Sequence, residues 1–283
     1  MKNRRVENVI NEIKRDKGAI LAIVFIIFII SISLAAPLIP IDPSKINISN
    51  AMSKPSLQNW FGTDKVGRDY FIRTIYGGRV SLAVGILSML TTVTVGVAVG
   101  TIAGYFGGRI DSILMRIVDV LSAIPWMILV TVMSVLLKPG FKTIIIVIGL
   151  FTWMGIARLV RAETLSIKER DYVAYGKFIG VPAPVIILRH IIPAVFPTII
   201  VSATTGISGA IMTESSLSFL GLGIQEPMSS WGSLLQDAQG HLQHSIHMAF
   251  LPGLFIFLTI FSFNKLGNVM RVFAEPRVSA GDK

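Results

Sequence analysis

The chain has 283 residues, of which 52% are hydrophobic and only 15% are charged, and its mean hydropathy is +0.69. Soluble globular domains carry roughly a quarter charged residues, so this composition excludes an ordinary soluble fold and indicates that lipid surrounds most of the chain. The net charge is +10, but Lys and Arg lie between apolar stretches and form no single basic face, so no nucleic-acid partner is expected. The absence of cysteine excludes disulfides and thiolate metal sites.

The first apolar stretch, residues 19–41, follows a charged N-terminal segment, residues 1–18. It is longer than the roughly 7–15 residues of a signal-peptide core, so we expect an uncleaved first transmembrane helix. An external loop over residues 42–79 would follow it.

Five further stretches are long and apolar enough to cross roughly 30 Å of hydrocarbon. They cover residues 80–104, 117–137, 143–160, 191–221 and 249–267. The sequence therefore predicts an all-α polytopic membrane protein of about six transmembrane helices. Five of these spans form a domain over residues 80–267, followed by a C-terminal tail at 268–283.

Two local patterns predict further features of these spans. Pro125 is predicted to kink the third span, because proline lacks the N–H of the helical hydrogen bond. Gly96 and Gly100 are spaced for close approach of helix backbones, which predicts a tightly packed bundle.

The distribution of Lys and Arg predicts the orientation, since positive charge favours the cytoplasmic side. With the N-terminus inside, the inner segments hold 18 of the 26 basic residues and the outer segments hold 8. Both termini are therefore expected in the cytoplasm. The external loop 42–79 contains six of the eight outer charges, but its length of nearly forty residues makes it less topogenic than a short loop.

Between the fourth and fifth spans lies a cytoplasmic loop over residues 161–190, far longer than a simple connection requires. Its residues 165–179 contain no proline and predict one helix. Gly180 and Pro182 then end that helix, and a second helix is expected to begin near Val185. A stiff projection of this kind indicates an interface with a partner, or a lid over the protein's own opening.

The loop also carries a family resemblance. The segment DYVAYGKFIGVPAPVIILRHIIPAV resembles the cytoplasmic loop of bacterial ABC importer permeases, and the chain as a whole is similar to the C-type permease of the peptide/nickel importers. The similarity extends over FGTDKVGRDYFIRTIYGGRVSLAVG, AGYFGGRIDSILMRIVDVLSAIPWMIL, ARLVRAETLSIKERDYV, ESSLSFLGLGIQEP, SSWGSLL and FNKLGNVMRVFAEPR, in family order. The resemblance implies a type I ABC importer permease fold with one extra N-terminal span.

The same resemblance implies a function and partners. The chain would form, with a sister permease, the pathway for peptides or nickel and metal chelates, in the inner membrane of a bacterium and in contact with membrane lipid. An extracytoplasmic binding protein would deliver the cargo, and two ABC ATPases would drive transport. The residues expected to transmit their movement are Asp171, Tyr172, Ala174, Tyr175, Gly176, Gly180 and Pro182.

One departure from the family pattern changes the expected docking. Where the family has an acidic-Ala-Ala triplet, this chain has Ala174, Tyr175 and Gly176. The missing carboxylate removes an ion pair with the ATPase. Docking would then depend on shape and on the small residues at 174 and 176.

The chain contains no phosphate-binding loop of the form G-x-x-x-x-G-K-[ST] and no paired nucleophile and base. It is therefore predicted not to be an enzyme and to hold no cofactor. ATP and Mg would be bound by the partner ATPases.

Glu214 lies within an apolar stretch, where a carboxylate is costly unless it faces water or a partner. It is predicted to line the translocation pathway together with Thr213, Ser215 and Ser218. The alternative is a carboxyl that is neutral, or hydrogen-bonded to a neighbouring helix or to the sister permease.

His241, His244 and His247 are spaced to share one face if they lie on a helix, and imidazole is a common ligand of nickel, copper and zinc. A metal site on the outer side is one interpretation. A solvated histidine face is the other.

Two functional alternatives stay open. An ion-gradient-driven secondary transporter would place charged residues at the membrane midplane and show an inverted repeat, of which only Glu214 is a sign. A membrane receptor or scaffold would use the loop at 171–184 to bind a signalling partner.

Overall fold

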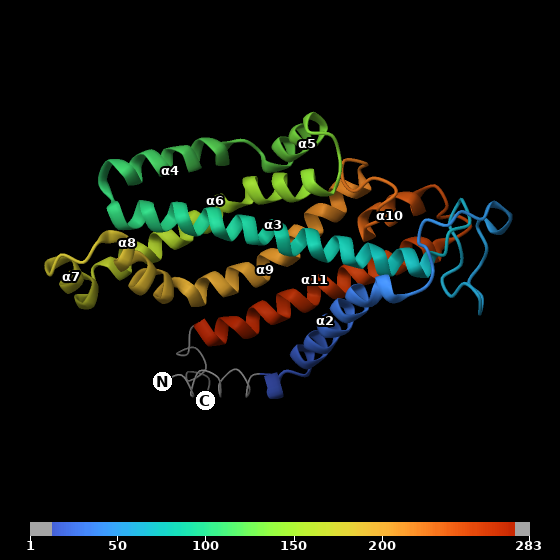
Figure 1. The fold of residues 1–283 in the computed structure, drawn as a ribbon, viewed down its shortest axis with the longest axis horizontal. Helices are drawn as coiled ribbons and strands as arrows, with labels where there is room; N and C mark the ends of the chain where they lie inside the picture. The colour runs from blue at the N-terminus through green and yellow to red at the C-terminus, as the bar shows by residue number, and fades with distance from the viewer. Residues whose placement is uncertain (1–12, 275–283) are drawn as a thin grey trace.

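The computed structural model describes residues 13–274, and the regular elements in that range are helices (Figure 1). Five helices are long and apolar enough to cross a membrane, or up to six if one bent pair counts as a single span. The prediction of an all-α polytopic protein with about six spans is therefore confirmed. Most of the predicted N-terminal segment 1–18 and the end of the tail 268–283 lie outside the described residues.

Three long helices form the centre of the molecule and run side by side (Figure 1). They are α3 (Tyr70–Phe106), α6 (Phe141–Lys168) and α9 (Ile192–Phe219). The helices α3 and α6 continue beyond the predicted limits of their spans, chiefly α3, which begins ten residues before position 80, whereas α9 lies within its predicted limits. Asp69 caps its start by accepting a hydrogen bond from the N–H of Ile72 at 2.9 Å.

The close approach of α3 and α6 depends on glycine. A Cβ added at Gly100 would lie 2.5 Å from the carbonyl oxygen of Ala157, and one at Gly96 would lie 2.8 Å from Cβ of Ile156. Such distances leave no room for any side chain, so the two backbones meet directly. The predicted tight packing is confirmed, and it lies within the chain.

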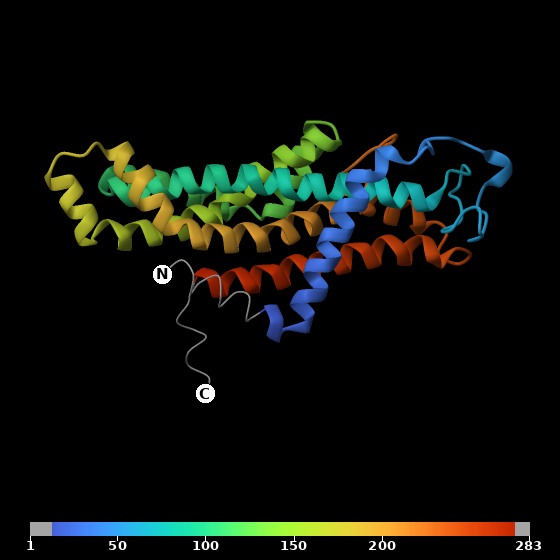
Figure 2. The same cartoon turned by 60° about the horizontal axis from the view of Figure 1, so that its bottom comes forward.

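Two further helices, α2 (Lys17–Ala35) and α11 (Ile246–Ala274), pack against one side of these three central helices. Figure 2 shows α2 crossing α11 obliquely. Nζ of Lys265 lies 2.6 Å from a carboxylate oxygen of Asp16, the residue that caps α2. The ion pair fixes the start of the N-terminal span to the end of the last one.

The predicted span at 117–137 is a bent helix pair and not one continuous helix. The structure has two helices there, α4 (Gly108–Ala123) and α5 (Trp126–Leu136), which are bent by 83° relative to each other. Pro125 stands at the break as predicted, but as the N-cap residue that precedes α5 and not as a kink within one helix.

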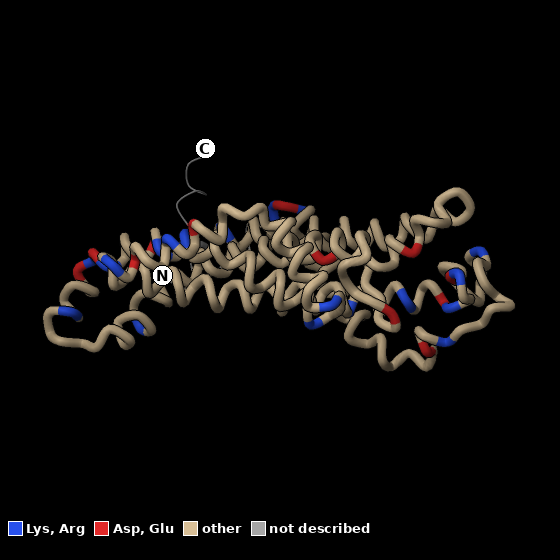
Figure 3. Tube along the Cα trace, turned by 90° about the horizontal axis from the view of Figure 1, so that it is seen from above, with Lys and Arg blue, Asp and Glu red and all other residues tan. Residues whose placement is uncertain are grey.

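The remaining elements are short. The loop predicted to be cytoplasmic contains α7 (Asp171–Phe178), α8 (Ala183–Ile186) and a π-helical turn (Ile187–Ile191) that runs into α9. On the other side of the membrane lie α10 (Trp231–Gln239) and two 3₁₀ turns, Ala36–Leu38 and Ile48–Asn50. Charged residues gather mainly toward the two ends of the long axis, as expected for a protein whose middle lies in lipid (Figure 3).

Candidate functional site

The helix α7 lies at one extreme end of the molecule, beyond the ends of α3 and α6 (Figure 1). The predicted continuous helix over 165–179 is wrong, because α6 ends at Lys168 and α7 begins at Asp171. Arg170 adopts an extended conformation (φ −74°, ψ 144°), which interrupts the helical hydrogen bonds. The helix α7 is therefore a separate element joined to α6 by a short turn.

The end of α7 has the geometry predicted for Gly180. This residue has a φ of +79°, and its N–H donates to the carbonyl of Lys177 at 3.1 Å. The N–H of Val181 donates to the carbonyl of Gly176 at 3.0 Å, which completes a Schellman motif. Glycine is favoured here because a side chain at positive φ is strained. Pro182 then begins α8.

The faces of α7 differ sharply. Val173 and Gly176 are buried within the chain. Gly176 is therefore not at the surface where a partner was expected to approach it closely. Large residues are exposed instead: Tyr172 by 44%, Tyr175 by 65% and Phe178 by 88%. Asp171 and Ala174 are exposed with them.

Contacts with neighbouring segments hold α7 in place. The ring of Tyr172 lies 5.9 Å from that of His190, and the ammonium of Lys177 lies 4.8 Å above the ring of Tyr105 at the end of α3. The buried side chain of Val173 belongs to a cluster with Ile167 and Ile186. The helix is thus packed against α3, α6 and α8 while its outer face stays free.

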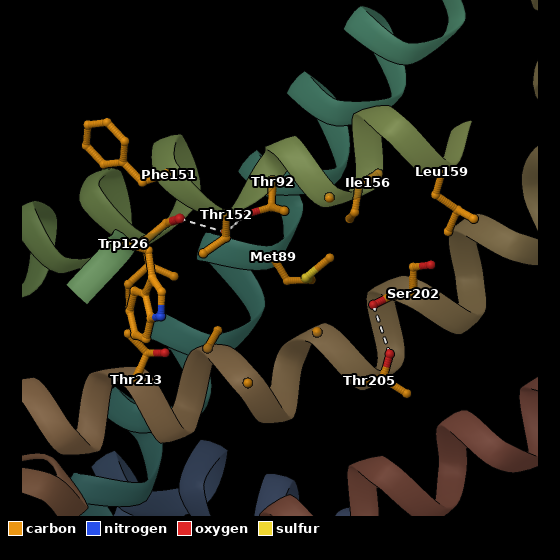
Figure 4. Close-up of a pocket in the computed structure, with 15 residues that line it drawn as sticks. Met89, Thr92, Trp126, Phe151, Thr152, Ile156, Leu159, Ser202, Thr205 and Thr213 are labelled. Carbon is orange, nitrogen blue, oxygen red and sulfur yellow. Dashed lines mark hydrogen bonds between the residues drawn. The ribbon is translucent and has the colours of Figure 1, made fainter. Parts of the chain in front are cut away.

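A cavity of about 550 Å³ opens between α3, α5, α6 and α9 (Figure 4). Its wall carries no ionisable side chain. Hydroxyls and glycines alternate with apolar groups along it, from Thr92, Thr152, Ser202, Thr205, Thr213, Gly155, Gly206 and Gly209. Trp126, the first residue of α5, closes one side, so the break at Pro125 directs an aromatic ring toward the cavity.

Most of these cavity residues were not singled out from the sequence. The hydroxyls of Thr92 and Thr152 lie 2.7 Å apart across α3 and α6. A threonine or serine inside an apolar span is common, because its hydroxyl can bond to its own helix, as Thr205 does to the carbonyl of Val201 at 3.0 Å. Only the arrangement of the helices shows that these residues share one cavity.

The four residues predicted for the pathway separate in the structure. Thr213 lies in the cavity wall, whereas Ser215 lies at an apolar groove between α9 and α11. Glu214 is fully buried, with 0% of its surface exposed, and neither it nor Ser218 contributes to that wall.

The carboxyl of Glu214 accepts hydrogen bonds from Ser218 at 2.7 Å and from Ser81 of α3 at 3.1 Å. This is the hydrogen bond to a neighbouring helix that the sequence left as an alternative. A role for Glu214 in gating stays a prediction.

An ion-pair network that the sequence did not predict lies on the side predicted to be external. Asp64 accepts hydrogen bonds from Nη1 of Arg73 at 2.5 Å and from Nε of Arg68 at 2.6 Å. Arg68 also binds Glu226 at 2.7 Å, which joins the external loop to the segment after α9. Burial alone would raise the pKa of Asp64, but the N–H and guanidinium of Arg68, with Arg73, hold it below its usual value.

The three outer histidines do not share a helix face. His241 and His244 lie in the turn that follows α10, and His247 lies in α11. Within residues 13–274, no three His, Cys, Asp or Glu side chains are placed to hold a metal ion. The interpretation of a metal site at His241, His244 and His247 is therefore not supported.

Comparison with known proteins adds the family. Residues 96–280 match the family described as "binding-protein-dependent transport system inner membrane component", and residues 7–55 match the "N-terminal TM domain of oligopeptide transport permease C". The chain is 40% identical to the oligopeptide transport system permease protein OppC of Haemophilus influenzae, over 93% of this chain and 86% of the relative.

Two further relatives agree with this assignment. The dipeptide transport system permease protein DppC of Bacillus subtilis is 39% identical, over 94% of this chain and 84% of its own. The glutathione transport system permease protein GsiD of Escherichia coli is 37% identical, over 94% and 88%. The resemblance stated from the motifs is confirmed, and the chain belongs to the family of inner membrane components of binding-protein-dependent transport systems, as a permease of the peptide-importer type.

Proposed function

We propose that this chain is the permease subunit of an ATP-driven importer that carries peptides across the inner membrane of a bacterium. The observation that carries the proposal is the match over more than nine-tenths of the chain to permeases named for oligopeptides and dipeptides. Nickel, the other cargo expected from the motifs, is less favoured, because the outer histidines form no metal-binding group in the described range.

The chemistry of the cavity supports a peptide as cargo. Its hydroxyls, such as those of Thr92 and Thr213, offer donors and acceptors without charge, and its glycines leave the backbone accessible. Groups of this kind can bind peptide amides whatever the side chains are. A sister permease would supply the opposite wall.

The exposed face of α7 supports docking of an ATPase. Tyr175 and Phe178 project from a helix whose other face is packed, so a partner that seats them in an apolar cleft would move α7 as a rigid body. Aromatic residues are typical anchors of protein interfaces. They replace the missing carboxylate at position 174, and the ATPases would bind ATP and Mg while this chain does no covalent chemistry.

The importer purified from native membranes and placed in proteoliposomes tests the function. Uptake of tri-alanine with its binding protein should require ATP and continue without an ion gradient. Uptake that stops with a protonophore but not when ATP is omitted would instead establish a secondary transporter.

The docking role of α7 is tested by co-purification. The double change Y175S/F178S should reduce the amount of ATPase recovered with the chain by about tenfold, since each buried aromatic anchor contributes about 1 kcal/mol or more. The matched control is Phe28→Ser, because Phe28 is also an exposed aromatic residue but lies on α2. Equal recovery from both variants would contradict docking on α7.

A further inference from the structure

A second cavity, of about 500 Å³, lies at the outer side and is separate from the hydroxyl-lined cavity described above. Its walls come from the start of α3, the first residue of α6 and the segment 227–229, with Pro43 and Ser44 of the external loop. The volume is within the range of roughly 300–1,000 Å³ found for small-ligand sites. The cavity is therefore large enough to hold a charged end group with the atoms attached to it.

Ion pairs neutralise three cations at this end of α3 and its loop, namely Lys65, Arg68 and Arg73. Lys65 pairs with Asp237 at 3.2 Å, and Arg68 and Arg73 pair with Asp64 and Glu226. Arg79, which lines the cavity, belongs to none of these pairs.

Arg79 differs from Arg73, the other arginine in this wall, in its exposure and in its ion pairs. Arg73 is 3% exposed and fully used by its ion pairs, whereas Arg79 is exposed on the cavity wall. Across residues 13–274, its guanidinium forms no ion pair with a carboxylate. No carboxylate lines the cavity, so nothing in the described wall neutralises this charge.

The other polar groups of the wall suit an anion. Tyr76 lies one turn before Arg79 on α3, and hydroxyls of Ser44 and Ser229 complete the polar part of the wall. A guanidinium presents a planar pair of N–H donors that matches the two oxygens of a carboxylate or phosphate. Arg79 is about 14 Å along α3 from Tyr70 and shares the cavity with Phe141, which begins α6, so the site lies at the outer edge of the membrane span.

We propose that this outer cavity binds an anionic oxygen group, with Arg79 as its principal partner and Tyr76 as a second donor. Two sources carry that chemistry at the outer membrane edge: the terminal carboxylate of a peptide and the phosphate of a lipid headgroup. Only the first source rests on the proposed function.

The test measures how fast phenylglyoxal, a reagent for arginine, modifies Arg79 in the complete importer, with mass spectrometry as readout. Arg109 on α4 is the internal reference, because it is also exposed and forms no ion pair in the described part of the chain. In the phosphate-free detergent dodecyl maltoside, tri-alanine at about twice the Kd of the site should slow modification of Arg79 about threefold, because the free fraction of a site falls by 1 + [L]/Kd. Tri-alanine amide, which lacks the carboxylate, should not.

A parallel preparation in phosphatidylglycerol nanodiscs separates the two sources. Slower modification there than in detergent, without a further effect of tri-alanine, identifies the lipid phosphate as the occupant. Modification of Arg79 that is the same in both media and with both peptides overturns the site.

Variants supply a second measurement. Arg79→Ala should raise the KM for tri-alanine uptake, with Arg79→Lys intermediate and Arg109→Ala unchanged, if the carboxylate is the occupant. ATP-dependent uptake by the unaltered importer is recorded in the same preparation, so a failure of the anion site is distinguished from a failure of the proposed function.

Discussion

The carboxyl of Glu214 is the centre of a hydrogen-bonded cluster that joins four segments. Ser81 of α3 and Ser218 of α9 donate to it, and their oxygens in turn accept from the N–H groups of Trp231 at 3.2 Å and Ile224 at 3.0 Å. A buried polar group is stable only when it is hydrogen-bonded in this way. The cluster thereby fixes α10 and the segment before it to the ends of the two long helices.

Two substitutions separate the parts of this role. Glu214→Gln keeps one oxygen that accepts from one serine, and its NH₂ group can donate to the hydroxyl oxygen of the other, so it should change the free energy of unfolding little. Glu214→Leu leaves the hydroxyls without an acceptor and should cost about 1–3 kcal/mol for each unsatisfied group. The midpoint of thermal unfolding in detergent measures both.

Uptake by the Gln variant then tests gating. Normal stability with lost uptake would support a gating role for the carboxylate, and normal uptake would leave Glu214 as a structural residue.

The stability of the external loop should depend on pH through the carboxyl of Asp64. Its pKa is lowered in the folded protein, so its contribution to stability is present above the pKa of an unfolded Asp, about 3.9. That contribution is lost as the pH falls through the lower, folded value. Cleavage of the loop by pepsin should accelerate as the pH is lowered below about 4.

A substitution that removes the charge of Asp64 should loosen the loop in the same way at pH 7. Asp64→Asn should increase tryptic cleavage of the loop at pH 7, whereas Asp42→Asn, which keeps an oxygen to accept the N–H of Ser44, should not. Equal cleavage of the two variants would show that the network around Asp64 does not hold the loop.

At the scale of elements, α7 can transmit movement from an ATPase to the membrane helices only if its ends are rigid. Gly180 has a φ of +79°, and a Cβ added there would meet nothing within 4 Å. A substitution therefore acts through backbone strain, of about 1–2 kcal/mol for an L-residue in this region, and not through a clash.

Gly180→Val should uncouple the importer, so that ATP hydrolysis continues while uptake falls. Gly240→Ala is the control, because its φ of −72° suits alanine and its Cβ would also meet nothing within 4 Å. Uptake at the normal rate in Gly180→Val, measured with equal amounts of protein in the membrane, would refute the coupling role.

At the scale of the whole molecule, ion pairs of the external loop reduce the weight of its basic residues in predicting the membrane orientation. Of the six basic residues in the external loop and start of α3, Arg68 and Arg73 are buried and paired with carboxylates. Their charges are neutralised within the fold, which reduces the apparent conflict with inside termini.

The orientation is directly testable because the chain has no native cysteine. A membrane-impermeant maleimide should label Ser56→Cys in intact spheroplasts and should label Ala174→Cys only after the membrane is opened. The reverse pattern would place both termini outside.

The sequence by itself determined the class of the protein, most of its spans and the end of the helix α7. Apolar runs predict membrane helices because lipid cannot satisfy charged groups, and Gly180 followed by Pro182 predicts a helix end because of local backbone geometry. These properties depend on residues that are neighbours in the chain.

Only the tertiary structure decided which residues meet. Thr92 and Thr152, or Arg68 and Glu226, are far apart in sequence, and a threonine or arginine carries no local sign of its distant partner. The size of the bend at Pro125 and the turn at Arg170 were not predicted, because hydropathy measures how apolar a segment is and not the direction in which its backbone continues. The cavities, the buried position of Glu214 and the lack of an ion pair at Arg79 follow from packing, and packing is a property of the whole chain.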